Sequence, residues 1–200
     1  MIGVDLGNKF LKVCKISGYN QKTKNYSIVS AMVDISALDQ SAKSLSIASL
    51  LNKLDIEKES VFLSVSGKDV INRDIVLHRN KNKSKNIKNE IKVEVENTIT
   101  ENLQNMYTSY TIVRNISDKE YNVIFSAAPK ELINSKFSLF GTMEDISVSG
   151  VTIDSFALVN AFNHFGPDFK NSESIVLINI GHKVTNVVVL NNKELVFFVT

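Results

Sequence analysis

The chain has 200 residues, 44% of them hydrophobic, and a formal net charge of +2 at pH 7. This length and composition are typical of a globular protein with one domain or two small ones, and the charge is too small to indicate a nucleic-acid-binding protein. The single cysteine, Cys14, excludes an internal disulfide, and its place in an apolar strand predicts a buried structural thiol. No uncharged apolar stretch approaches the roughly 18 residues of a membrane helix, so the sequence predicts a cytoplasmic protein.

Two apolar runs joined by a glycine-containing turn open the chain, in the segment IGVDLGNKFLKVCKI at residues 2–16. This arrangement predicts a β-hairpin, and the alternating residues 25–35 add a third strand. The next apolar positions fit one face of a helix: Leu45, Ile47, Leu50, Leu51 and Leu54. Residues 60–67 favour a strand that ends at Gly67. The opening segment is therefore predicted to be a βββαβ unit.

The middle of the chain alternates strands and helices. Residues 70–78 predict a strand, and the polar, basic segment that follows favours a solvated loop over a contact with an anionic membrane. Over residues 84–105, apolar side chains at four-residue spacing predict an amphipathic helix. These side chains are Ile87, Ile91, Val95, Ile99 and Leu103. Residues 107–115 and 120–128 then predict two strands joined by a short hairpin loop.

The last part is predicted to begin with a helix that has Pro129 in its first turn and runs to about Phe140. Residues 145–155 predict a strand, and residues 156–166 predict an amphipathic helix that ends at Gly166. A second hairpin begins at Ser174, and residues 194–200 predict one more strand after it.

The second hairpin repeats the first. Residues 176–190, VLINIGHKVTNVVVL, align with residues 2–16 at a constant offset, since 179 − 5 = 174. In this alignment Asp5 meets Asn179, Gly7 meets Gly181 and Lys9 meets Lys183. We expect one structural element to be used twice.

The chemistry of the two turns suggests an anion. A glycine at a hairpin tip permits positive φ and lets backbone N–H groups point outward together, which forms a concavity for phosphate oxygens. Two facing tips are expected to clamp a polyphosphate, with Asp5 holding Mg²⁺ through water because this ion keeps several waters. The candidate cofactor-binding residues are Asp5, Gly7, Asn8, Lys9, Asn179, Gly181, His182, Lys183 and Thr185.

Several alternatives stay open at these positions. Asn179 brings no negative charge, so we expect weaker metal binding than an aspartate would give. His182 and Lys183 fit exposed turn residues as well as they fit phosphate contacts. His78 and His164 have no partner at metal-ligand spacing, which favours structural or solvent-facing histidines. No catalytic residue can be assigned from these patterns.

The motif D-x-G-x-x-x-x-K-V, met by Asp5, Gly7, Lys12 and Val13, resembles the first phosphate motif of the actin-like ATPase superfamily. The repeat at residues 176–190 resembles its second phosphate motif. Within that superfamily the chain is similar to the PilM family of type IV pilus assembly proteins, which is related to the division protein FtsA. The segments that carry this resemblance are VFLSVSGKDVINRDIVLHRN, IKNEIKVEVENTI, NVIFSAAPKELINS and SGVTIDSFALVNAF.

The resemblance implies an α/β fold with a ribonuclease-H-like first lobe, an inserted small α+β subdomain and the start of a second lobe. The implied division is 1–78 for the first-lobe core, 79–150 for the inserted subdomain, 151–172 for the return to the core and 173–200 for the second lobe. A complete member continues through an adenosine-binding segment. We therefore expect this chain to be an incomplete member of the family.

The resemblance also implies a function. Proteins of this kind are scaffolds that bind the cytoplasmic N-terminal tail of a PilN-type inner-membrane protein, in a groove between the first-lobe core and the inserted subdomain. The chain is thus expected at the inner membrane through its partner, with other pilus assembly proteins and a second copy as further partners. ATP and Mg²⁺ are expected to bind weakly or not at all, with at most weak ATPase activity. The alternatives are an active ATPase or sugar kinase of this superfamily, and an FtsA-like or secretion-system relative that anchors another membrane assembly.

Overall fold

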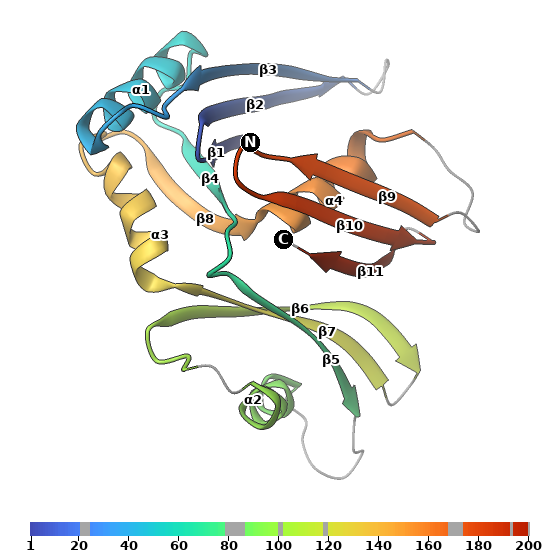
Figure 1. The fold of residues 1–200 in the computed structure, drawn as a ribbon. Coiled ribbons are helices and arrows are strands. Elements are labelled where there is room, and N and C mark those ends of the chain that lie inside the picture. The colour runs from blue at the N-terminus through green and yellow to red at the C-terminus, as the bar shows by residue number, and fades with distance from the viewer. Residues whose placement is uncertain are drawn as a thin grey trace.

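The computed structural model describes residues 1–20, 25–78, 87–99, 102–117, 120–167, 174–192 and 194–199. The described residues form three β-sheets with helices packed on them (Figure 1). Figure 1 shows α1 (Gln40–Lys53) and α2 (Ile87–Thr98) at opposite ends of the molecule. The helices α3 (Lys130–Phe137) and α4 (Asp154–Phe165) lie between these ends.

The first sheet has five strands in the order β3-β2-β1-β4-β8. The strands β1 (Ile2–Leu6), β2 (Phe10–Asn20) and β3 (Asn25–Asp34) form an antiparallel meander, as the sequence predicts. The strands β4 (Ser60–Val65) and β8 (Ser147–Ile153) extend the sheet in parallel with β1. The carboxyl ends of β1, β4 and β8 therefore meet at one edge of the sheet.

Alternation in β1 and β2 buries one face of this sheet. Ile2 and Val4 are 0% and 2% exposed, and Leu11 of β2 is 0% exposed. Helix α1 covers this face with Ile47 and Leu51, which confirms the predicted apolar stripe except at Leu45, which is 72% exposed. The carboxylate of Asp39 accepts a hydrogen bond of 2.8 Å from the N–H of Ala42 and caps the start of α1.

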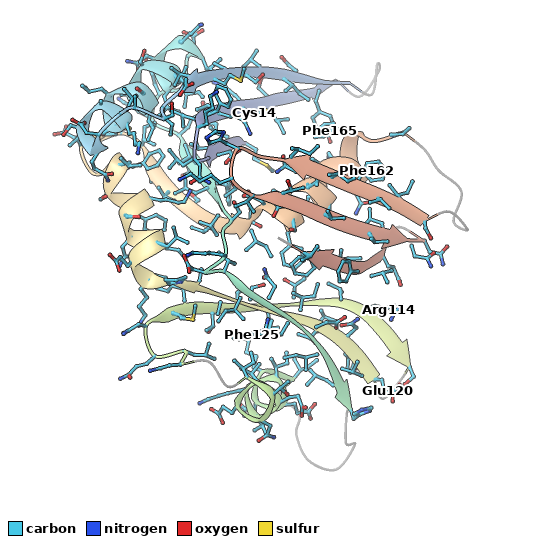
Figure 2. All side chains as sticks on the ribbon, viewed as in Figure 1. Cys14, Arg114, Glu120, Phe125, Phe162 and Phe165 are labelled. Carbon is cyan, nitrogen blue, oxygen red and sulfur yellow. The ribbon has the colours of Figure 1, made fainter. Side chains whose placement is uncertain are left out.

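The second sheet has the order β5-β7-β6, with bounds Ile71–His78, Glu120–Pro129 and Met106–Ser117. Helix α2 packs on it through the predicted stripe, since Ile91 and Val95 join a core cluster with Ile75 and Phe125 (Figure 2). The predicted helix is too long at its C-terminal end, because α2 ends at Thr98 and residues 102–105 form a turn rather than a helix. Residues 79–86, 100–101 and 118–119 lie outside the described residues, and they include the predicted start of this helix and the basic segment.

The sheet topology shows which sheet two of the predicted segments join, while the predicted division of the chain stays a prediction. Strand β5, expected in the first-lobe core at residues 1–78, pairs with β7 along its whole length. The 3-10 helix η1 (Ser138–Phe140), expected within the inserted subdomain, packs on the first sheet, where Leu139 and Phe140 enter the core, whereas α3 contacts β7 and lies between the two sheets through Ile133. An alternating pattern shows that a strand has one buried face, but it does not show which sheet the strand joins.

The third sheet has the order β11-β10-β9, with bounds Glu194–Val199, Thr185–Asn191 and Ser174–Ile180. Its buried face packs on α4 and on the second sheet, where Val188 and Leu190 contact the cluster that contains Val159 and Ile124. The second predicted hairpin is therefore confirmed as β9 and β10.

The two hairpins bury opposite faces of equivalent strands. At the offset of 174, Ile2 corresponds to Val176 and Val4 corresponds to Ile178. Ile2 and Val4 are buried beneath α1, whereas Val176 and Ile178 are 55% and 58% exposed. The face that α1 covers in the first copy is thus exposed in the second.

Cys14 is a free, half-buried thiol on β2, less enclosed than the sequence predicts. Burial raises the pKa of this thiol above its ordinary value. Among the described residues, no helix has the length and apolar composition needed to span a membrane.

Candidate functional site

The two hairpin turns share one backbone geometry. The N–H of Gly7 donates to the carbonyl of Phe10 at 3.0 Å, and the N–H of Gly181 donates to the carbonyl of Val184 at 2.9 Å. A Cβ atom would lie 3.0 Å from the Phe10 oxygen at Gly7, and 2.6 Å from the Val184 oxygen at Gly181. Each glycine is therefore required because a carbonyl oxygen approaches its Cα closely.

Neither glycine has the positive φ that we expected or an N–H that points outward, whereas the anion site at the tips stays a prediction. The described glycines with positive φ are Gly18 and Gly67, and the N–H groups of Gly7 and Gly181 point into their own turns. A hydrogen bond closes each turn, and it occupies the glycine N–H. That N–H is therefore not free to donate to a phosphate oxygen. Any anion at these tips has to be held by other groups.

Replacing these glycines tests the close approach. Gly181→Ala is expected to destabilise the protein by roughly 1–3 kcal/mol, because the added methyl group forces a backbone carbonyl to move. Gly7→Ala is expected to have a smaller effect, since its contact of 3.0 Å is longer than the 2.6 Å contact at Gly181. Urea unfolding gives the free energy of unfolding of both variants and so shows which substitution destabilises the protein more. Equal or reversed effects would contradict the role assigned to the turn oxygens.

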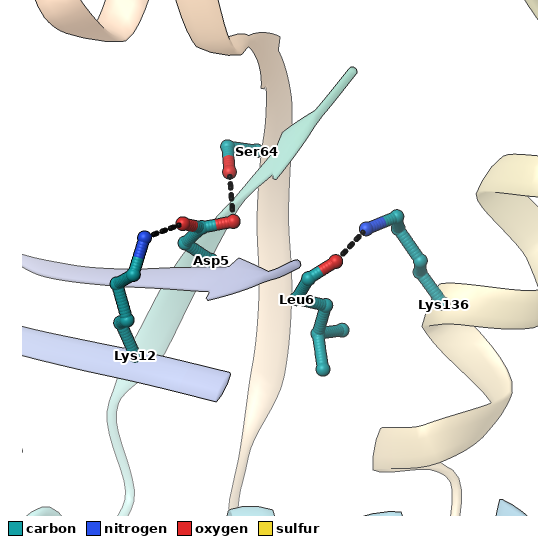
Figure 3. Close-up of polar contacts among 5 residues, drawn as sticks. All are labelled: Asp5, Leu6, Lys12, Ser64 and Lys136. Carbon is teal, nitrogen blue, oxygen red and sulfur yellow. Dashed lines mark hydrogen bonds and ion pairs between the residues drawn. The ribbon is translucent and has the colours of Figure 1, made fainter. Parts of the chain in front are cut away.

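Asp5 lies at the carboxyl end of β1 with both of its oxygens engaged (Figure 3). The Nζ of Lys12, its cross-strand neighbour on β2, forms an ion pair of 2.9 Å with Oδ2. The hydroxyl of Ser64 on β4 donates to Oδ1 at 3.3 Å. Lys12 stands at the lysine position of the phosphate motif, whereas Ser64 is brought here only by the pairing of β1 with β4.

Lys136 of α3 reaches the same end of β1 from the other side. Its ammonium donates to the carbonyl of Leu6 at 2.8 Å (Figure 3). Burial lowers the pKa of Lys136, and the nearby carboxylates Asp5 and Asp154 oppose that effect. Asp154 follows β8 directly, and its Oδ1 is buried without a hydrogen-bond partner in the described part of the chain.

The sequence did not identify Ser64, Lys136 or Asp154 as site residues. For Asp154 a signal existed, since it is an acidic residue directly after a strand that is parallel to β1. Nothing in the pattern of α3 distinguishes Lys136 from an ordinary exposed lysine.

The second hairpin carries a neutral pair at the equivalent position. Asn179 of β9 lies opposite Asn186 of β10, just as Asp5 lies opposite Lys12. Asn186 is 2% exposed, and its Oδ1 has no hydrogen-bond partner among the residues described. Burying two amides costs less than burying an ion pair, which explains why this more enclosed position has no charge.

Each hairpin tip carries a side chain whose charge acts on Asp34, at the end of β3. The pKa of Asp34 is lowered first by a 2.6 Å hydrogen bond from the Ser36 hydroxyl, then by the N–H of Ser36. The charges of Lys9 on one tip and His182 on the other lower it further. Lys9 lies 4.0 Å from the Asp34 carboxylate. Side chains of both copies therefore act on one carboxylate.

The remaining predicted residues lie in or beside the two turns, and all of them are exposed: Asn8, Gly181, Lys183 and Thr185. The two histidines outside the turns have structural partners. His78 lies 3.0 Å from a carboxylate oxygen of Glu120, and Nε2 of His164 shares a 2.8 Å hydrogen bond with the hydroxyl of Tyr26.

These residues fit an anion better than a metal ion held by protein ligands alone. Over the described ranges, no three His, Cys, Asp or Glu side chains are grouped so that they could hold a metal. Asp5 is already bound by Lys12 and Ser64. Mg²⁺ held through water by Asp5 stays a prediction, and it would depend on phosphate oxygens for its other ligands.

A cavity of about 460 Å³ lies between the first and second sheets. Its walls come from β6 and β7, from the ends of β4 and β8, and from α3 and α4. The large side chains Tyr107, Ile133, Phe137 and Phe156 line it, and none of its lining residues is charged. Such a lining of apolar groups and hydroxyls is typical of binding sites.

Comparisons with known proteins agree with this architecture. The family model of type IV pilus assembly protein PilM matches residues 3–200. A structure described as the PilM-PilN type IV pilus biogenesis complex is similar with a TM-score of 0.74 and 17% identity, over 98% of this chain and 60% of that chain. The cytoplasmic domain of EpsL, an inner-membrane component of the type II secretion system of Vibrio cholerae, is similar with a TM-score of 0.54 and 12% identity, over 95% of this chain and 66% of that one.

Comparison with curated proteins gives no match. At these identities the structural likenesses establish the fold alone, and they confirm the predicted α/β class. The chain spans 60% and 66% of the lengths of the two structures it resembles.

Proposed function

Because the chain belongs to the PilM family of type IV pilus assembly proteins, we propose that it is a scaffold that binds the cytoplasmic N-terminal tail of a PilN-type inner-membrane protein. The solved complex that it resembles contains PilM and PilN. We place the tail in the cavity between the two sheets, and its binding would hold the scaffold at the membrane surface.

The observation that carries this proposal is the uncharged lining of that cavity. It is large enough for part of a peptide, at about 460 Å³, and it offers aromatic and aliphatic side chains together with hydroxyl groups. Its walls belong to both the first sheet and the inserted sheet, which we take as β5, β6 and β7 with α2. A peptide there would contact both parts at once.

We further propose that ATP, if it binds, is held at the hairpin tips by side chains rather than by glycine N–H groups. The ammonium groups of Lys9, Lys12 and Lys183 would pair with its phosphates. The closed contacts of Asp5 with Lys12 and Ser64, and the neutral pair Asn179 and Asn186, support weak binding and at most weak ATPase activity.

A charge placed in the cavity tests the partner site. Phe137→Asp is expected to weaken binding of a synthetic PilN-type tail peptide about tenfold or more, because the carboxylate must be desolvated without a partner. Phe137 is 37% exposed, so the fold should survive the substitution. Isothermal titration with the peptide gives the affinity.

Phe197→Asp is the matched control, because Phe197 is 55% exposed on β11 and does not line the cavity. It should bind the peptide as the wild type does. If both variants weaken peptide binding equally, the cavity is not the binding site. If the wild-type protein binds no tail peptide, the proposed function is overturned.

A further inference from the structure

The cavity runs along the free edges of two sheets. Among the described strands, β6 forms backbone hydrogen bonds with β7 alone, although β11 packs near it, and β8 forms them with β4 alone. Five consecutive residues of β6, 107–111, line the cavity, together with three consecutive residues of β8, 151–153. Successive side chains of a strand point to opposite faces, so a consecutive run of five residues is consistent with a cavity that follows the strand edge, although three residues of the central strand β7, 126–128, also line it.

The hydrogen bonds near the start of β6 show which backbone groups face this edge. The N–H of Lys130 donates to the carbonyl of Asn105 at 2.9 Å, whereas the N–H of Met106 donates to Leu103. Residues of an antiparallel pair alternate between bonding the partner strand and pointing away from it. Thr108 and Tyr110 therefore direct their N–H and C=O groups away from β7 and toward the free edge.

We propose that the partner tail binds as an added β-strand along the β6 edge, with backbone hydrogen bonds to Thr108 and Tyr110. This inference rests on the proposed function and specifies how its site recognises a peptide. An edge strand presents a row of unpaired donors and acceptors, and extended peptides bind such edges through their main chain.

The lining also specifies the chemistry of the peptide. Its segment in the cavity is extended and uncharged, because none of the lining residues could pair with a charge. Alternate side chains of this segment are apolar and pack against Ile133, Phe137 and Phe156, which line the same cavity as the β6 edge. Main-chain bonds provide the affinity, and these contacts provide the selectivity.

A scan with backbone-methylated peptides tests the binding mode on the unaltered protein. A synthetic PilN-type tail peptide is N-methylated at one residue at a time, and each peptide is titrated into the wild-type protein. Methylation at every second residue is expected to weaken binding about tenfold or more, because it removes a main-chain donor and blocks the edge. Methylation at the intervening residues should change the affinity about threefold or less.

Each outcome of the scan decides a different statement. A period of two along the peptide supports strand addition. Binding that shows no such alternation overturns the strand mode and leaves the partner proposal standing. Failure of the unmodified peptide to bind overturns the proposed function, and the strand mode with it.

Two substitutions at Thr108 test the same edge from the protein side. Thr108→Pro removes an N–H that points to the free edge, a position where a sheet tolerates proline, whereas Thr108→Val keeps that N–H. Thr108→Pro is expected to lose peptide affinity about tenfold or more while Thr108→Val binds normally. Equal binding by both variants contradicts the proposal, and the peptide scan remains decisive if Thr108→Pro does not fold. The wild type could instead self-associate in a way that Thr108→Pro abolishes. That result would assign the β6 edge to a second copy of the chain and would overturn the proposed binding of the tail there.

Discussion

Val4→Asp is expected to abolish cooperative folding, whereas Ile178→Asp at the equivalent position of the repeat leaves folding intact. Val4 is 2% exposed beneath α1, so an aspartate there buries an unpaired carboxylate and is expected to cost about 4 kcal/mol or more. Ile178 is 58% exposed, and a substitution there should change the free energy of unfolding by about 0.5 kcal/mol or less. Thermal unfolding followed by circular dichroism measures both variants.

The comparison is controlled by the repeat itself, because both positions lie on the first strand of a hairpin and directly before the acidic or amide position. Ile178→Asp also reduces the exposed apolar area, so it should lower any self-association that begins at this face. A loss of folding in Ile178→Asp as large as in Val4→Asp would show that the outer face of the third sheet is buried in solution.

Lys136→Met is expected to destabilise the protein by roughly 1–3 kcal/mol, because it leaves the partly buried Leu6 carbonyl without its donor. It also removes a cation that interacts with the unpaired carboxylate of Asp154, since the charge of Asp154 raises the pKa of Lys136. Urea unfolding gives the free energy. Lys130→Met on the same helix is the control, because Lys130 is exposed and its 3.1 Å bond to Gln104 lies at the surface.

The role of Lys136 has a second readout at the first hairpin. Without its bond to Leu6, the backbone amides of Gly7 and Asn8 should exchange faster with solvent, measured by hydrogen–deuterium exchange. Asp154→Asn in the Lys136→Met background should restore part of the lost stability, because the buried group is then neutral. Unchanged exchange at the hairpin, together with no recovery in the double variant, would show that Lys136 does not support the end of β1.

Helix α3 connects the two candidate sites. Ile133 and Phe137 line the cavity where we place the partner tail, and Lys136 contacts the strand that ends at Asp5. The helix follows β7 directly, so it also joins the inserted sheet to the first sheet. Any shift of α3 on peptide binding therefore acts on both sites.

The local elements could be predicted because their signals are local. The apolar stripe of α2 and the runs on either side of Gly7 and Gly181 each follow from a few neighbouring residues, and the structure confirms them. The offset of 174 residues likewise identified one element used twice. The turns themselves were predicted correctly in place but wrongly in chemistry, because the direction of a glycine N–H depends on which carbonyl closes the turn.

The sequence by itself determined the order of strands and helices, the face of each that is apolar, and the repeat of the phosphate-motif hairpin. Only the tertiary structure decided that β5 leaves the first sheet, that Ser64 and Lys136 converge on the end of β1, and that equivalent strand faces are buried in one copy and exposed in the other. The physical reason is that the periodicity of a segment shows only which of its residues are buried against apolar groups. The segments that supply those groups lie far away in the chain, and the periodicity does not identify them.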